Sequence, residues 1–166
     1  MSRLRKRCEL LLQGMPIPQP FDLDAFCAVV AARRGRPLTL QPTPGLSAGA
    51  PCGLWISVPT ADYVFYDPDT SRLHAEHIVL HELAHMLSGH TTKLDVSGGA
   101  LARLVPDLDP RTVRTVLGRV SYTTSQEREA EMLASLIRAR AAEPVAPPDL
   151  LGGTLSRVAD VLNFRS

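Results

Sequence analysis

The sequence predicts an α+β fold in which helices pack on a small antiparallel sheet. Two neighbouring runs, Cys52–Val58 and Tyr63–Tyr66, are rich in β-branched and aromatic residues and indicate paired strands. The segment Ser71–Ser88 follows them without a glycine or proline, which predicts a helix. A length of 166 residues fits one domain that buries most of its surface on folding.

The chain before the sheet predicts two helices joined by a stiff connector. Residues Arg3–Gln13 form the first helix, and the prolines of Met15–Pro20 keep the connector extended. Either Asp22 or Asp24 caps the second helix, because both precede its apolar residues. Gly35 ends that helix.

Three strands are expected between the second helix and the glycine-free segment. The first strand is short and covers Pro37–Gln41. The other two, Cys52–Val58 and Tyr63–Tyr66, form a hairpin through the turn Pro59–Asp62.

We expect a single domain made of three parts. Residues 1–20 carry the first helix and the connector, and residues 21–142 form the core. A short helix within the core begins at Asp109, with proline in its first position. Residues 143–166 hold a linker and a small amphipathic helix at Leu155–Phe164.

Charge and composition disfavour several classes of function. The net charge of +1 gives no general attraction to nucleic acids or membranes. No apolar run is long enough to span a bilayer, and Leu10–Leu12 is too short for the core of a signal peptide. The cysteines Cys8, Cys27 and Cys52 share no metal-type spacing and are expected as reduced thiols of a cytoplasmic protein. The basic stretch Ser2–Arg7 is expected on an exposed helix face, with a DNA contact as the alternative.

The predicted helix after the sheet, capped by Thr70 or Ser71, contains the motif H-E-x-x-H. On a helix, residues four apart share a face, so the imidazoles of His81 and His85 can bind one metal ion. Glu82 is rotated from His81 by about a third of a turn and can reach a water bound to that metal without being a ligand. The alternative is a buried helix with incidental histidines.

A later helix supplies the acidic residues that such a site needs. Catalytic zinc usually has three protein ligands and one position open to water. Glu127 is the candidate third ligand, and Glu131, one turn on, can accept the far N–H of a ligating histidine. Glu129 lies about 200° from Glu127 around the helix and is expected to point away. The alternative is a solvated acidic face at a helix start.

Together the two motifs resemble the pattern of the ImmA/IrrE-like metallopeptidases, a gluzincin-type family. The matching residues are His81, Glu82, His85, Glu127, Glu129, Ala130, Glu131 and Ala134. The resemblance implies a zincin-like fold, with Zn²⁺ held by His81, His85 and Glu127, and Glu82 as general base or acid. Mn²⁺ or Fe²⁺ also accepts this ligand set. Glu131 stands where the family more often has Asp.

The resemblance also implies a reaction and a class of partner. In such folds an edge strand beside the metal receives the substrate as an added strand, and Tyr63–Tyr66 is the candidate edge. Peptide hydrolysis would use Glu82 to take a proton from the attacking water and return it to the leaving amine. Tyr122 is a candidate donor to the oxyanion, with packing as the alternative. Characterised relatives cleave helix-turn-helix repressors, so we expect such a protein partner and no direct contact with nucleic acid or membrane.

Two further histidines leave the class of function open. His77, one turn before His81, is an additional ligand, a pocket wall or a partly exposed structural histidine. His90 either donates to a carbonyl at the helix end or lies near the metal, where a fourth protein ligand would make the metal structural. The alternative function is therefore a non-catalytic, metal-stabilised binding module, such as a toxin–antitoxin component. A DNA-binding regulator is a third reading.

Overall fold

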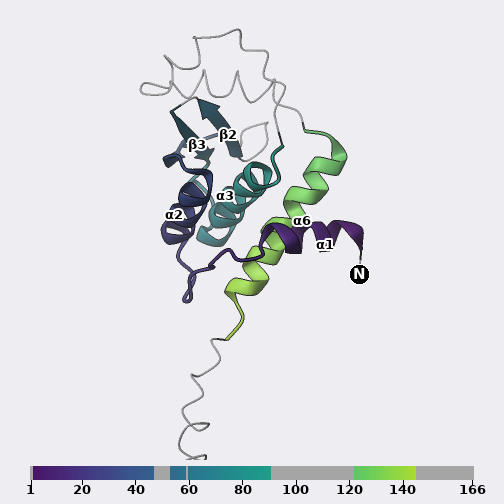
Figure 1. Cartoon of the computed structure of the whole chain (residues 1–166). Coiled ribbons are helices and arrows are strands. Elements are labelled where there is room, and N and C mark those ends of the chain that lie inside the picture. The colour runs from purple at the N-terminus through teal and green to yellow at the C-terminus, as the bar shows by residue number, and fades with distance from the viewer. Residues whose placement is uncertain (1, 47–52, 59, 91–121, 145–166) are drawn as a thin grey trace, which may run out of the picture.

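The computed structural model describes residues 2–46, 53–58, 60–90 and 122–144, and these residues form an α+β fold, as the sequence predicts. In chain order the elements are α1 Arg3–Leu11, α2 Leu23–Arg34, β1 Leu38–Pro42, β2 Gly53–Val58, β3 Ala61–Tyr66, α3 Arg72–Leu87 and α6 Thr124–Ala141. Figure 1 shows α6 running beside α3, with α1 lying across α6.

Several expected features fall outside the described ranges. They are Cys52, the short helix beginning at Asp109 and the helix at Leu155–Phe164. Cys8 and Cys27 are described, and both are buried free thiols. Among the described helices, none has the length and apolar character that crossing a membrane requires.

The described strands form a mixed sheet in the order β1-β3-β2, so the prediction of an antiparallel sheet was wrong. β2 and β3 form the expected hairpin, but β1 pairs with β3, the second strand of that hairpin. β1 runs parallel to β3, whereas β2 runs antiparallel to β3, so the sheet contains both kinds of pairing. Tyr63–Tyr66 was expected at an edge and instead lies in the centre of the sheet, because β1 occupies its other side. There Asp62 N–H donates to the Pro37 carbonyl and Thr43 N–H donates to the Tyr66 carbonyl, each at 2.8 Å.

The hairpin turn is tighter than expected, and Asp62 belongs to β3 rather than to the turn. Its side chain is 0% exposed and accepts hydrogen bonds from Arg34 Nε at 2.7 Å and Trp55 Nε1 at 3.1 Å. Burial alone would raise the pKa of Asp62, but hydrogen bonds, that from Arg34 first, outweigh it and lower the pKa. This buried ion pair joins α2 to the hairpin.

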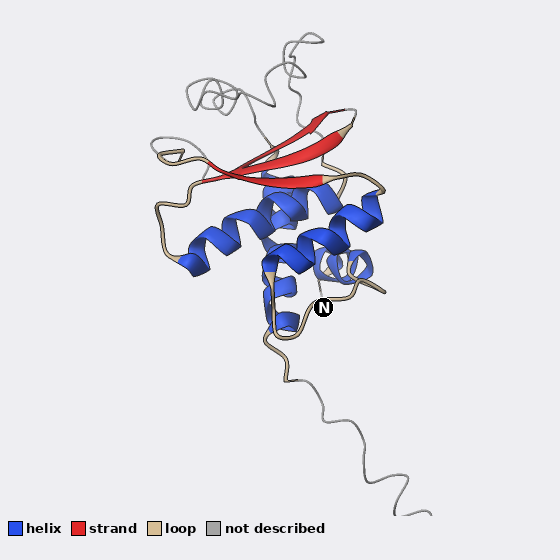
Figure 2. Cartoon of the chain, turned by 90° about the vertical axis from the view of Figure 1, so that its left-hand side faces the viewer, coloured by secondary structure: helices blue, strands red, loops and turns tan. Residues whose placement is uncertain are grey.

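The helices gather on one side of the sheet, as Figure 2 shows. α3 packs on β2 and β3 with one face and on α6 with another. The shared core includes Phe26, Val30, Val79, Leu80, Leu83, Leu133 and Ile137, all of them fully buried. Burying one such side chain stabilises the fold by about 1.5–3 kcal/mol. This packing fixes α3 relative to α6 and so fixes the distance between the two sequence motifs.

Capping residues set the ends of α2 and α3. Asp22, rather than Asp24, caps α2 by accepting a hydrogen bond from a backbone N–H of the first turn. Ser71, rather than Thr70, does the same for α3. Both helices end at a left-handed glycine, with φ of 67° at Gly35 and 68° at Gly89. A positive φ is accessible to glycine without strain, which explains why these two positions end the helices.

Candidate metal centre

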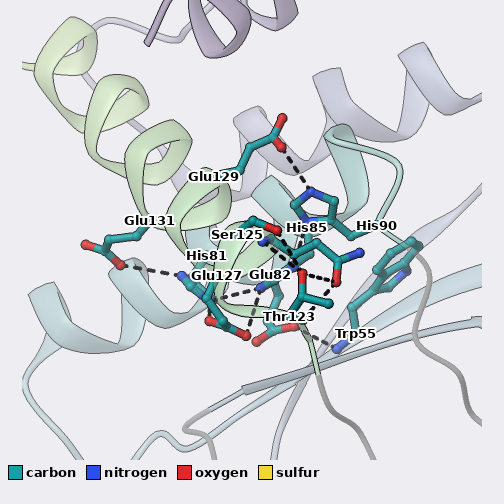
Figure 3. Close-up of polar contacts among 11 residues, drawn as sticks. Trp55, His81, Glu82, His85, His90, Thr123, Ser125, Glu127, Glu129 and Glu131 are labelled. Carbon is teal, nitrogen blue, oxygen red and sulfur yellow. Dashed lines mark hydrogen bonds and ion pairs between the residues drawn. The ribbon is translucent and has the colours of Figure 1, made fainter. Parts of the chain in front are cut away.

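Three side chains from α3 and α6 converge on one point. His81 Nε2 lies 3.1 Å from His85 Nε2 and 3.1 Å from Glu127 Oε2. His85 Nε2 lies 3.7 Å from Glu127 Oε1. Within the described ranges, these three residues form the one group of His, Cys, Asp and Glu side chains with metal-ligand spacing. Figure 3 shows the two imidazoles and the carboxyl group facing one another across the gap between the helices.

The chemistry of this donor set fits a divalent metal ion. Zinc bound tetrahedrally at about 2.0–2.1 Å from each donor keeps the donors about 3.3 Å apart, close to the observed spacing. Metal binding also needs neutral imidazoles. Burial, together with the neighbouring imidazoles of His81 and His90, lowers the pKa of His85 to about 3, so this imidazole is neutral at physiological pH. Glu127 is half-exposed and supplies the negative charge.

Glu82 lies beside this group but is not part of it. Its side chain is 5% exposed, and its Oε2 accepts a hydrogen bond from the backbone N–H of Trp55 at 3.0 Å. Burial raises the pKa of Glu82 to about 8; the Trp55 hydrogen bond opposes this shift, and the charge of Glu127 adds to it. A Cβ added to Gly53 would lie 2.9 Å from Glu82 Cγ and 2.7 Å from Ile78 Cγ2. β2 therefore closes tightly on the Glu82 side chain.

Glu131 lies on the far side of His81 from the convergence point. Its Oε2 is 3.5 Å from His81 Nδ1 and 3.2 Å from His77 Nε2. This is the arrangement expected of a carboxylate that accepts the far N–H of a ligand. His77 is outside the three-residue group and is partly exposed.

His90 also lies outside the three-residue group. Its Nδ1 is 3.0 Å from His85 Nδ1, the ring nitrogen opposite the one that faces His81. Its Nε2 is 3.4 Å from Glu129 Oε2. His90 therefore approaches the back of His85, and among the described residues no fourth side chain joins the group.

Glu129 was expected to point away from Glu127, and it does, but it is not a solvated residue. It is 6% exposed and pairs with Arg7 of α1, with Arg7 Nε 2.8 Å from Glu129 Oε1. Spacing could have revealed this burial, because Leu133 and Ile137 follow Glu129 at intervals of four on the apolar face of α6.

Tyr122 packs flat against a proposed ligand. Its ring stacks on that of His85, with centroids 3.6 Å apart and an angle of 14° between the planes. Its hydroxyl is buried, without a hydrogen-bond partner among the described residues. Burial raises the pKa of Tyr122, and the carboxyl groups of Glu82 and Glu127 raise it further. The tyrosine thus combines packing with a buried, unused donor.

A groove of about 610 Å³ borders two of the three donors, His81 and Glu127, and extends along α6 past Glu131. Its walls include Leu4 of α1, His81 of α3, and Glu127 and Met132 of α6. His81 and Glu127 therefore border open space, whereas His85 does not line this groove.

Comparison with known proteins returned no relative: no protein-family model, no curated protein and no solved structure matches the chain. The geometry of this centre and the motif pattern are therefore the grounds for inferring a function.

Proposed function

We propose that this protein is a zinc-dependent peptidase of zincin-like architecture. His81, His85 and Glu127 hold the metal, and Mn²⁺ or Fe²⁺ suits the same donors. Glu82 is the general base and acid. The observation that carries this proposal is the convergence of two imidazoles and one carboxylate beside a buried carboxyl group that stays outside the donor set.

The side chains around the donors suit hydrolysis of an amide. When bound, zinc supplies a Lewis acid that activates water and polarises the substrate carbonyl. A pKa of about 8 for Glu82 in the metal-free protein is near the range in which a carboxyl group can both accept and return a proton. Glu82 takes the proton from the attacking water and gives it to the leaving amine. The buried hydroxyl of Tyr122 is available to donate to the developing oxyanion.

We propose β2, in place of Tyr63–Tyr66, as the strand that receives the peptide. β2 is an edge of the described sheet and packs on α3. The backbone N–H of Trp55 points away from β3, because it donates to Glu82. An extended peptide paired with this edge would pass beside Glu82.

The proposed partner is a regulatory protein, and the motif resemblance favours a helix-turn-helix repressor. The support for this substrate class is the resemblance alone. The alternative function is a metal-stabilised binding module that holds its partner without cutting it. The position of His90 behind His85 favours the peptidase, since a structural metal would need a fourth protein ligand.

Three proteins test the proposal: the wild type, Glu82→Gln and the control Glu76→Gln. Glu76 lies on the same helix, where it pairs with Arg72. Each protein is loaded with zinc, its metal content is measured, and it is incubated with a peptide library read by mass spectrometry. We expect all three to hold zinc and only Glu82→Gln to lose cleavage. Cleavage by Glu82→Gln at the wild-type rate would refute the catalytic role. Zinc binding without cleavage by the wild type would favour the binding module.

A further inference from the structure

A line of polar contacts, buried except at its Arg7 end, runs from the proposed metal ligand His85 to the N-terminal helix. His85 contacts His90, His90 contacts Glu129, and Glu129 pairs with Arg7 of α1. His85, His90 and Glu129 are 0%, 5% and 6% exposed. Figure 3 labels three members of this line, His85, His90 and Glu129, and shows His90 and Glu129 on the side of His85 away from Glu127.

The chemistry of each contact fixes the position of one proton. A carboxylate only accepts hydrogen bonds, so the His90 nitrogen facing Glu129, Nε2, must carry a proton. In a neutral His90, the other nitrogen, Nδ1, is then an acceptor. Because that acceptor faces His85 Nδ1 at 3.0 Å, the proton of neutral His85 belongs on Nδ1. His85 Nε2 is left with its lone pair directed at His81 and Glu127.

The backbone at the end of α3 holds His90 in this position. Gly89, with φ of 68°, turns the chain back on the helix. The backbone N–H of His90 then donates to the carbonyl of His85 at 3.0 Å, and that of Gly89 donates to Met86 at 3.2 Å. This pair of bonds is the Schellman ending of a helix, and it keeps the two imidazoles adjacent.

α1 secures the other end of the line. Arg7 pairs with the carboxylate of Glu129, and the thiol of Cys8 donates to its backbone carbonyl at 3.7 Å. Glu129 is therefore held from a second helix as well as from its own. Its carboxylate is oriented toward His90 even though it lies far from the donor group.

We propose that His90 and Glu129 form a proton-ordering pair that keeps His85 in the tautomer able to bind a metal through Nε2. They are positioning residues that touch neither metal nor substrate. Glu131 lies 3.5 Å from His81 Nδ1, but His81 Nε2 also faces a carboxylate, that of Glu127 at 3.1 Å, so Glu131 does not fix one tautomer of His81 and serves here as the comparison residue. The inference rests on the proposed metal site, but the tautomer of His85 is a property of the metal-free protein.

The test compares Glu129→Gln with Glu131→Gln, two isosteric changes on one helix. Long-range ¹H–¹⁵N NMR of the metal-free proteins reports which nitrogen of each histidine carries the proton. A glutamine amide can accept or donate, so it no longer imposes one tautomer. We expect a single Nδ1–H tautomer of His85 in the wild type and in Glu131→Gln, and a tautomer mixture in Glu129→Gln.

Zinc affinity gives a second measurement on the same variants. Removing a group that orients a metal ligand typically weakens metal binding by about 10–100-fold. We expect a loss of that size in Glu129→Gln. In His90→Gln, the amide oxygen can still accept a hydrogen bond from His85 Nδ1, whereas the side chain of His90→Leu cannot. We therefore expect His90→Gln to bind zinc more tightly than His90→Leu and less tightly than the wild type.

Two results would overturn the proposed proton-ordering pair. One is a wild-type His85 protonated on Nε2, and the other is a Glu129→Gln protein with an unchanged His85 tautomer and unchanged zinc affinity. Neither result depends on cleavage. A wild type that binds zinc but cleaves no peptide would count against the peptidase function and would not affect the proposed proton-ordering pair. The amide spectrum of each variant verifies that it is folded.

Discussion

Replacing Glu82 by glutamine should change how the stability of the metal-free protein depends on pH. The folded protein keeps Glu82 protonated up to a pKa of about 8, against 4.5 for the ordinary group, because the side chain is buried. The unfolded chain releases this proton at the ordinary pKa. The contribution of Glu82 to the stability of the folded protein is therefore fully present below pH 4.5 and is lost as pH rises toward 8.

His85 acts in the opposite direction over a different range. Its pKa is lowered from 6.5 to about 3, so its effect is a loss of stability as pH falls from 6.5 toward 3. Between pH 4.5 and 6.5 the two effects cancel. Between pH 6.5 and about 8, Glu82 acts without that opposition. One pKa unit corresponds to about 1.4 kcal/mol, so the wild type should lose about 2 kcal/mol across this window.

Urea unfolding at a series of pH values, with a chelator present, measures this loss. Trp55, the single tryptophan of the chain, is buried and reports unfolding by its fluorescence. We expect the wild-type free energy of unfolding to fall between pH 6.5 and 8, and that of Glu82→Gln to stay level. Groups common to both proteins cancel in the comparison. Equal slopes in the two proteins would refute the assignment of a proton to buried Glu82.

Three further predictions concern the donors and the backbone around them. Glu127→Gln should weaken zinc binding by more than the ~10–100-fold expected for a residue that only supports a ligand, as measured by calorimetry. Gly89→Ala and Gly35→Ala place a Cβ at almost the same positive φ, so each should destabilise the fold by about 1 kcal/mol in urea unfolding. Only Gly89→Ala should also lower zinc affinity; equal affinities would contradict the role given to the end of α3. Gly53→Ala should displace the Glu82 side chain and lower the rate of peptide cleavage by up to about 100-fold, while zinc stays bound. Full activity in that variant would show that Glu82 needs no close support from β2.

The features that the sequence predicts well are local ones. Ser71 and Gly89 bound α3 because capping and left-handed backbone depend on a few neighbouring residues. The spacing of His81 and His85 fixes their common face for the same reason. Glu127 could be named as their partner because a catalytic zinc site needs a third protein ligand and the acidic motif follows H-E-x-x-H. The packing of α3 on α6 then brings the three side chains together.

The features that the sequence does not predict depend on distant contacts. Nothing near Leu38–Pro42 shows that this strand pairs with the second strand of the hairpin, so the parallel pairing and the edge position of β2 were missed. Asp62 was placed in the turn between the two predicted strands, whereas its ion pair with Arg34 accompanies its burial as a residue of β3. The contact of His90 with Glu129 needs the packing of α6, which supplies the carboxylate.

The contact between α1 and Glu129 has a consequence for the order in which the molecule assembles. Cys8 and the carbonyl it reaches are 121 positions apart in the sequence. During synthesis the first helix leaves the ribosome early and has no docking site until almost the whole core has been made. His81 and His85 of α3 likewise have no contact with the Glu127 carboxylate until α6 has been made. The proposed binding of a metal ion by all three donors would therefore come late in folding, because contacts between residues far apart in the sequence form slowly.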